Sequence, residues 1–256
     1  MTEETMANQS NTCVSYSLQD GVAVIQMDDG KRNALPPERL AGLNAALDRA
    51  LADRVPVVIT GREGTFSAGY DLKIVKAGGW RGLGMLVAGY SLTARLLAHP
   101  YPVVMACNGH SLAMGVFLMV SGDYVIGTRG DGRISANEVE LGMNMPRVGA
   151  AVLRQRLAPH AFQSAVNLAK CFSTEEALAA GFFDELVDAP DLLPRAYQLA
   201  RQLGKLDMRA HAATKRAVRA SVIRRIRWSI PLDLAYAVRH GVRAMLADKG
   251  SRKPAA

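Results

Sequence analysis

An apolar run at residues 112–120 constrains the fold of this chain more than any other feature. A strand-like run at residues 102–106 precedes it, and the Asn108-Gly109 pair between the two is typical of a turn. The apolar run spans about nine residues, far short of the roughly 20 that cross a bilayer, and Gly122 closes it. The pattern predicts a buried strand, a turn and a short buried helix. Taken alone, that helix could be an element of the core and nothing more.

A second glycine turn, residues 66–73 (FSAGYDLK), follows another buried strand at residues 55–59. Two such turns can lie side by side at the carboxyl edge of a parallel sheet, where open α/β folds bind ligands. A helix that begins there points free N–H groups and the positive end of its dipole at the ligand. Two convergent N–H donors form an oxyanion hole suited to a thioester carbonyl.

Strands and helices alternate through the first two thirds of the chain, which predicts a parallel α/β core. A β-hairpin is expected at residues 14–27, a helix opening at Pro37, a glycine-rich mobile connection at 78–84, and a helix at 85–98. After Gly149 the sequence favours helices at residues 150–157, 160–169, 174–180, 192–220 and 232–248. We divide the chain into a disordered tail (1–12), an α/β core (13–195) and a C-terminal helical region (196–256).

The composition fits a globular protein of 256 residues without a membrane segment or signal peptide. Its three cysteines have neither metal spacing nor a disulfide pattern, which indicates a cytoplasmic protein. Thirty-one Lys and Arg against 23 Asp and Glu give a net charge of +8. This excess suits a nucleic acid or a phosphorylated small molecule, although the basic stretch at 215–227 could equally be a solvated helix face.

Several common chemistries lack their motif. The chain has no Walker A loop, no GxGxxG fingerprint, no GxSxG elbow and no metal-ligand spacing. Nucleotide cleavage, dinucleotide binding, serine hydrolysis and metal catalysis are therefore not expected.

Four segments together resemble the crotonase family, the enoyl-CoA hydratases and isomerases. They are residues 66–73, residues 102–109 (PVVMACNG), residues 33–35 (NAL) and residues 177–184 (ALAAGFFD). The resemblance covers residues 14–245. It implies a crotonase-like ββα spiral core with a C-terminal helical extension used in trimerisation. It also implies an acyl-CoA thioester substrate, no cofactor beyond the coenzyme A of that substrate, and a homotrimer or hexamer.

The same resemblance places oxyanion donors at the main-chain N–H groups of Tyr70 and Met114. Met114 stands in Ala113-Met114-Gly115, where the family usually has three glycines. The resemblance further predicts a group of substrate and CoA contacts at Lys31, Arg32, Ala68, Asp71, Leu72, Lys73 and Phe117.

Under this resemblance, the chain keeps only one of the two glutamates that the family's hydratases use. Phe117 falls where the first would stand, and Glu138 falls on the second. Hydration needs a held water and two proton transfers, whereas moving a double bond from position 3 to 2 needs one carboxylate that takes a proton from C2 and returns it to C4. An apolar Phe117 would also exclude water and raise the pKa of Glu138. The expected reaction is therefore isomerisation, with Glu138 as the catalytic carboxylate.

Alternatives remain open from the sequence. Glu138 could be a carboxylate at a helix N-terminus, and Glu140 could replace it if the alignment slips. The protein could be an enoyl-CoA hydratase of altered active site, a non-catalytic acyl-CoA binder, or an RNA-binding protein that uses the basic stretch. Nucleic acid is the less expected partner, because Trp228 is the only aromatic residue near these cations.

Overall fold

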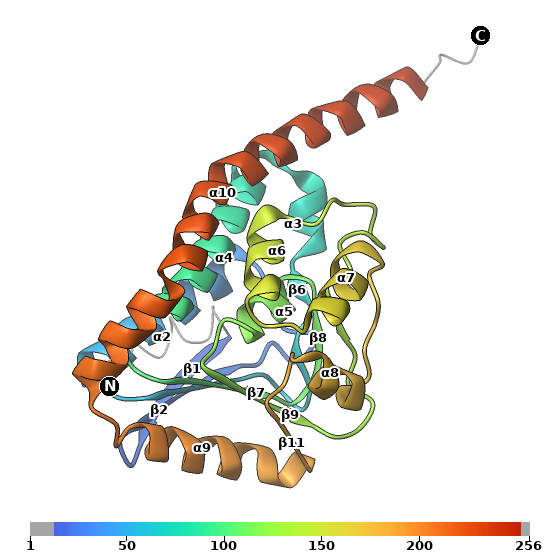
Figure 1. Cartoon of the computed structure of the whole chain (residues 1–256). Coiled ribbons are helices and arrows are strands. Elements are labelled where there is room, and N and C mark those ends of the chain that lie inside the picture. The colour runs from blue at the N-terminus through green and yellow to red at the C-terminus, as the bar shows by residue number, and fades with distance from the viewer. Residues whose placement is uncertain (1–12, 252–256) are drawn as a thin grey trace.

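A six-stranded sheet forms the centre of the computed structural model, which describes residues 13–251 (Figure 1). The predicted tail at 1–12 lies outside these residues. The strand order is β1 (Val14–Gln19), β2 (Val22–Met27), β4 (Val57–Thr60), β7 (Val103–Cys107), β9 (Tyr124–Thr128) and β11 (Glu185–Val187). The hairpin of β1 and β2 is antiparallel and every other neighbouring pair is parallel. The predicted parallel α/β core is confirmed.

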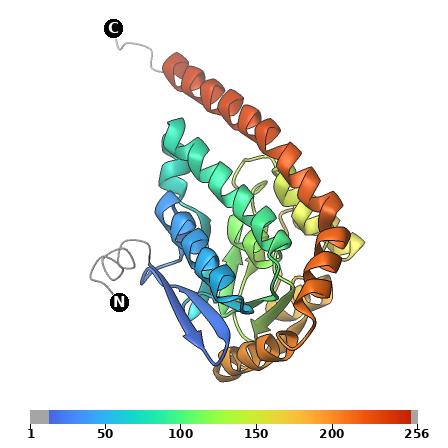
Figure 2. The same cartoon turned by 90° about the vertical axis from the view of Figure 1, so that its left-hand side faces the viewer.

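Helices cover both faces of this sheet. One face carries α9 (Leu192–Leu203), which packs its apolar side on β2, β4, β7 and β9 (Figures 1 and 2). The other face carries the larger core, with α2 (Pro37–Asp53), α4 (Gly79–Ala98) and α5 (Met114–Met119). Strands β4 and β7 are buried along their whole length, as expected for parallel strands covered on both sides.

Three strands of the main sheet lead into short strands of a second sheet. After β4, β7 and β9 the chain forms β5 (Gly64–Ser67), β8 (Gly109–Leu112) and β10 (Ile134–Ser135), a parallel sheet in the order β10-β8-β5. Strand β6 (Gly69–Tyr70) follows β5 in the sequence and pairs in parallel with β3 (Ala34–Leu35) as a separate two-stranded sheet. Each repeat is therefore two strands followed by a helix, which is the expected spiral.

The remaining helices are α3 (Leu72–Ala77), α6 (Arg147–Arg154), α7 (Pro159–Asn167), α8 (Thr174–Ala180), the short 3-10 helix η1 (Ala189–Asp191) and α10 (Met208–Ser251). Helix α8, predicted at these residues, begins with a Ser173 cap in a full capping box with Glu176 and ends at Gly181 in the left-handed region. No helix within residues 13–251 combines the length and apolar content that a membrane crossing needs.

Three predicted element boundaries are wrong: those of the connection at 78–84, of the helix at 192–220 and of the separate helix at 232–248. The glycine-rich stretch at 78–84 is not a mobile connection, because α4 already begins at Gly79. The helix expected at 192–220 is broken after Leu203, where Gly204 packs so closely on Pro56 that a Cβ would lie 2.7 Å from its ring. The chain then continues as one 44-residue helix, α10, which includes Pro231.

Helix α10 packs mainly on α4 and α6 (Figure 2). Near its start, Lys215 and Arg219 form ion pairs of 2.6 and 2.9 Å with Asp123. Asp123 also accepts a hydrogen bond from the N–H of Val103, the first residue of β7. Asp123 thus has a structural role, because it joins α10 to the sheet.

Candidate active site

The ends of the three short parallel strands bring the main predicted residues to one edge. Tyr70, Met114 and Glu138 lie two or three residues beyond the last residues of β5, β8 and β10. Because these strands are parallel and adjacent in the order β10-β8-β5, residues that follow their ends emerge side by side. Met114 lies at the end of the central strand, between the other two.

The two glycine turns touch, as the sequence predicted. Gly69, at φ 81°, lies so close to the start of α5 that a Cβ would be 2.8 Å from the carbonyl oxygen of Leu112 and 3.0 Å from the nitrogen of Met114. Only glycine fits there. Met114 is the first residue of α5, so its N–H has no acceptor within the helix. The N–H of Tyr70 is one residue from this contact.

Backbone strain marks the same place. Ala113, which precedes Met114, has φ 48° and ψ −123°, although it is not a glycine. Its N–H donates to the carbonyl oxygen of Ser135 at 2.8 Å, which ties this turn to the end of β10. Such a conformation costs about 1–3 kcal/mol and persists where the surrounding structure imposes it, often at functional sites.

Glu138 is buried in a turn and is not at the start of a helix. Glu138 is only 5% exposed, and its main-chain carbonyl oxygen accepts a hydrogen bond from the N–H of Met143 at 2.9 Å. Helix α6 begins only at Arg147, so the alternative that Glu138 is a carboxylate at a helix N-terminus is wrong. Glu140, the alternative carboxylate, is exposed to solvent.

Burial dominates the electrostatics of Glu138. Among the described residues, its Oε2 atom has no hydrogen-bond partner. Desolvation raises the pKa of the carboxyl group to about 7, against the opposing effect of a backbone hydrogen bond. A carboxylate with this pKa can both accept and return a proton near neutral pH.

Three aromatic side chains, those of Phe117, Tyr70 and Tyr90, pack in or against the larger core. Phe117 is 1% exposed, and a Cβ on Gly149 of α6 would lie 2.4 Å from its ring. The half-buried phenol of Tyr70 has a pKa raised well above its ordinary value by desolvation first, then by Tyr90 and by Glu138. Tyr90, which no sequence motif marks, is also buried and its pKa is raised by burial, Asp233 and Glu138. The charge of Glu138 thus contributes to the raised pKa of both phenols.

The residues expected to hold coenzyme A lie in two segments that the fold brings together. The N–H of Ala68 donates to the carbonyl oxygen of Arg32 at 2.9 Å. Lys31, Arg32, Leu72 and Lys73 are exposed. The carboxylate of Asp71 accepts from the N–H groups of Lys73 and Ile74 and so caps α3. Their contacts with a ligand, like the contact predicted for Phe117, remain predictions.

Asn33 connects these two segments from within. It is fully buried, and its side-chain amide donates to the carbonyl oxygens of Met27 (2.9 Å) and Phe66 (3.3 Å). The sequence marked Asn33 only as part of a motif. Its packing shows that it holds the glycine turn at residues 66–73 against the end of β2.

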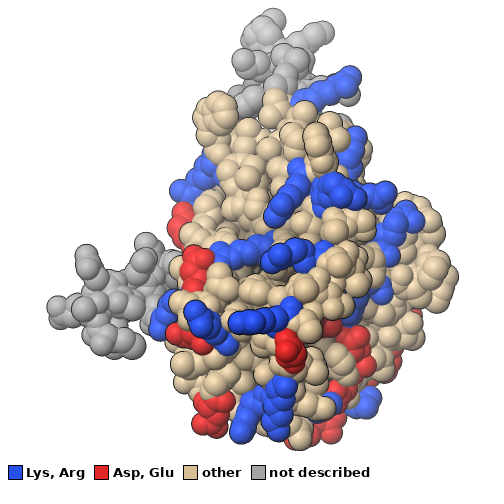
Figure 3. Space-filling model, turned by 60° about the vertical axis from the view of Figure 1, so that its left-hand side comes forward, with Lys and Arg blue, Asp and Glu red and all other residues tan. Residues whose placement is uncertain are grey.

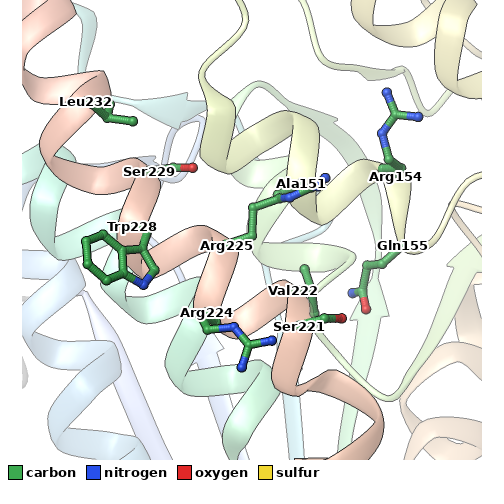
Figure 4. A pocket seen from close by; sticks show the side chains of 10 residues that line it. All are labelled: Ala151, Arg154, Gln155, Ser221, Val222, Arg224, Arg225, Trp228, Ser229 and Leu232. Carbon is green, nitrogen blue, oxygen red and sulfur yellow. The ribbon is translucent and has the colours of Figure 1, made fainter.

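The basic surface lies away from this site. Lys and Arg side chains are spread over the face that carries α10 (Figure 3). A groove of about 680 Å³ between α6 and α10 has Arg154, Arg224, Arg225 and Trp228 among its lining residues (Figure 4). Neither Glu138 nor Met114 lines it. Because Lys215 and Arg219 are paired with Asp123, the basic stretch offers fewer free cations than its sequence suggests.

The paired-strand spiral and the buried carboxylate of Glu138 define an α/β protein of the crotonase fold with a candidate site for proton transfer. Residues 17–235 match the enoyl-CoA hydratase/isomerase family. The chain therefore belongs to that family, and the resemblance inferred from the four motifs is confirmed.

Similar proteins carry the names of both activities. A Mycobacterium tuberculosis structure described as an enoyl-CoA isomerase is 45% identical, with a TM-score of 0.84 over 88% of this chain and 98% of the other. An enoyl-CoA hydratase from Mycobacterium ulcerans is 43% identical, with a TM-score of 0.85 over 88% and 99%. A peroxisomal enoyl-CoA delta isomerase 2 from Arabidopsis thaliana is 31% identical over 158 residues, which are 58% of this chain and 66% of that protein.

Proposed function

We propose that this protein is an enoyl-CoA isomerase that converts 3-enoyl-CoA thioesters to 2-enoyl-CoA thioesters. The observation that carries the proposal is the isolation of Glu138, a buried carboxylate with no hydrogen-bond partner for Oε2 among the described residues and a pKa raised to about 7. A single group of this kind serves a reaction in which the proton that is removed is also returned.

In the proposed reaction the N–H groups of Tyr70 and Met114 bind the thioester oxygen. Glu138 removes a proton from C2, and the electron pair of the C–H bond moves toward that oxygen to give a dienolate. The N–H donors stabilise its negative charge, and each such donor is typically worth about 2.7–4 kcal/mol in the transition state. Protonated Glu138 then gives the proton to C4, and the double bond rests between C2 and C3.

Hydration is the competing reaction, and relatives named hydratase make it the natural alternative. It requires a bound water and a second proton-transfer group. The position that the resemblance assigns to that group is occupied by Phe117, buried against Gly149. A phenyl ring can neither donate nor accept the proton, which favours isomerisation.

Two substrates separate these reactions. Purified protein should convert 3-hexenoyl-CoA to its conjugated 2-isomer, seen as a rise in the absorbance of the conjugated thioester, and leave crotonyl-CoA nearly unchanged. Glu138→Gln should lower isomerisation by about 10²–10⁴-fold, whereas Glu140→Gln, a change of the exposed neighbouring carboxylate, should retain it. Rapid hydration of crotonyl-CoA without isomerisation of 3-hexenoyl-CoA would refute the proposal.

A further inference from the structure

The turn at residues 66–73 contains a fully buried hydroxyl group to which the proposed function assigns no role. It belongs to Ser67, the last residue of β5, which is 0% exposed. The hydroxyl donates to the main-chain carbonyl oxygen of Asn33 at 2.7 Å and accepts from the N–H of Gly69 at 3.1 Å. Because a serine hydroxyl has a single hydrogen to donate, these two bonds together fix its direction.

Ser67 is also held by the segments on either side of it. A Cβ on Gly115 of α5 would lie 2.5 Å from the carbonyl oxygen of Ser67 and 2.9 Å from its Cβ, so α5 packs directly on this residue. The side-chain amide of Asn33 donates to the carbonyl oxygen of Phe66 at 3.3 Å, which joins the two segments a second time. Ser67 therefore cannot shift without disturbing the start of α5, where Met114 lies.

Gly69 links this hydroxyl to the proposed oxyanion donor. Its own N–H is held by Ser67, and the next peptide group along the chain carries the N–H of Tyr70. Gly69 has φ 81°, and a glycine can rotate its flanking peptide groups with little steric resistance. Close packing on the start of α5 and pairing with β3 restrict where Gly69 lies. The bond to Ser67 additionally fixes the plane of the peptide group that precedes it.

We propose that Ser67 is a positioning residue for the oxyanion hole: by holding the N–H of Gly69, its hydroxyl keeps the N–H of Tyr70 directed at the thioester oxygen. The inference rests on the proposed function, because it requires that oxygen to lie at the N–H groups of Tyr70 and Met114. Ser67 touches no substrate and acts only through the main chain. Donors that are oriented before the reaction stabilise the charge that develops on the oxygen, so Ser67 matters more for the enolate than for the uncharged thioester.

The variant Ser67→Ala removes the hydroxyl and keeps the Cβ that packs on Gly115. Loss of a whole oxyanion donor lowers kcat roughly 10²–10³-fold, so a donor that is only misdirected should lower the kcat for 3-hexenoyl-CoA by about 10–100-fold. The KM should change by less than about threefold, because the substrate carbonyl is uncharged.

Two thioesters test the same distinction by binding alone. Butyryl-CoA presents a neutral carbonyl, whereas acetoacetyl-CoA has an acidic C2 and can bind as an enolate with negative charge on the thioester oxygen. Titration calorimetry of Ser67→Ala should give a Kd for butyryl-CoA within about threefold of the natural value and a Kd for acetoacetyl-CoA that is about 10–100-fold weaker.

The matched control is Ser121→Ala. Ser121 is also 0% exposed, and its hydroxyl donates to the main-chain carbonyl oxygen of Phe117, likewise at 2.7 Å. It lies beyond the end of α5 and not in a turn that carries a proposed donor. This variant loses a buried hydrogen bond of the same kind, and it should keep kcat and both Kd values within about twofold.

Each other outcome has a distinct meaning. Natural kcat and natural acetoacetyl-CoA affinity in Ser67→Ala would overturn the positioning role, and equal weakening of both thioesters would overturn it in favour of a general packing role. Amide hydrogen exchange followed by NMR on the natural protein needs no variant to fold: the N–H of Gly69 should exchange slowly, and rapid exchange would show that Ser67 does not hold it. Failure of the natural protein to isomerise 3-hexenoyl-CoA would instead overturn the proposed function, and this inference with it.

Discussion

Replacing Glu138 by glutamine should stabilise the folded protein while it removes the proposed activity. Burial raises the pKa of Glu138 from its ordinary 4.5 to about 7. Between these two pH values the folded chain holds a proton that the unfolded chain has released, so stability falls as pH rises through this window. Each pKa unit is worth about 1.4 kcal/mol, so the full cost above pH 7 is about 3 kcal/mol.

Glutamine keeps the shape of the side chain and cannot ionise, so the variant avoids this cost. The free energy of unfolding of Glu138→Gln should exceed that of the natural protein by less than about 1 kcal/mol at pH 5 and by about 3 kcal/mol at pH 8. Urea unfolding followed by circular dichroism, at one protein concentration throughout, measures this difference.

The exposed neighbour Glu140 provides the matched control. Glu140→Gln should change the free energy of unfolding by no more than about 0.5 kcal/mol at either pH. A stability difference for Glu138→Gln that is the same at pH 5 and pH 8 would refute the reasoning. It would mean that the carboxylate is hydrated or paired in the folded protein.

Three further results are expected. The kcat/KM of isomerisation should rise with pH up to about 7 and then level, because the base form of Glu138 must be present in the free enzyme; a flat profile from pH 5 to 8 would contradict this. In α4, Gly84→Ala should raise the unfolding free energy by about 0.5–1 kcal/mol, since nothing lies within 4 Å of the added carbon. Gly89→Ala should instead lower it by about 1–3 kcal/mol, because there the added carbon meets Tyr70. Equal effects of the two variants in urea unfolding would argue against the packing described. Asp123→Ala should cost about 3–5 kcal/mol by leaving two largely buried cations unpaired, and a loss below about 1 kcal/mol in the same assay would show that these pairs do not anchor α10.

Much of the fold follows from local patterns in the sequence. Buried parallel strands such as β4 and β7 are short apolar runs bounded by turns, and the hairpin turn at Asp20-Gly21 has positive φ at both residues. The contact of the two glycine turns was also predictable, since it depends on where parallel strands end. Tyr70, Met114 and Glu138 themselves were nominated by the resemblance to the crotonase family.

The small sheet and the start of α4 were not predictable in this way. Strand β10 has only two residues, and its place beside β8 depends on the tertiary fold and leaves no periodic pattern. Glycines at 78–84 resemble a loop because glycine weakens an isolated helix. The helix forms nevertheless because its other face packs on α2 and α10, and packing outweighs local propensity.

Contacts between single residues that are far apart in the sequence could not be predicted from it either. Asp233 is far along α10, yet its carboxylate accepts from the N–H of Val148 at 3.0 Å and from Arg147 at 3.1 Å. This carboxylate fixes α10 on the first turn of α6 and lies close enough to Tyr90 to raise its pKa. No motif surrounds either residue, so only the folded chain relates them to Glu138.

The packing of Phe117 argues that a hydratase cannot be recovered by restoring one carboxylate. Phe117 is 1% exposed and its ring lies directly on Gly149, so Phe117→Glu would place a carboxyl group in a space without water. Ionising it there would cost several kcal/mol unless it gained a partner. If it lies beside Glu138, as the family resemblance predicts, each carboxyl group would raise the pKa of the other further. At neutral pH the pair would hold at least one proton and would lack the water that one member must activate. Phe117→Glu should therefore leave hydration of crotonyl-CoA at background and lower the unfolding free energy. A clear gain of hydration by this single variant would mean that water already reaches Glu138, and that its raised pKa has a cause other than burial.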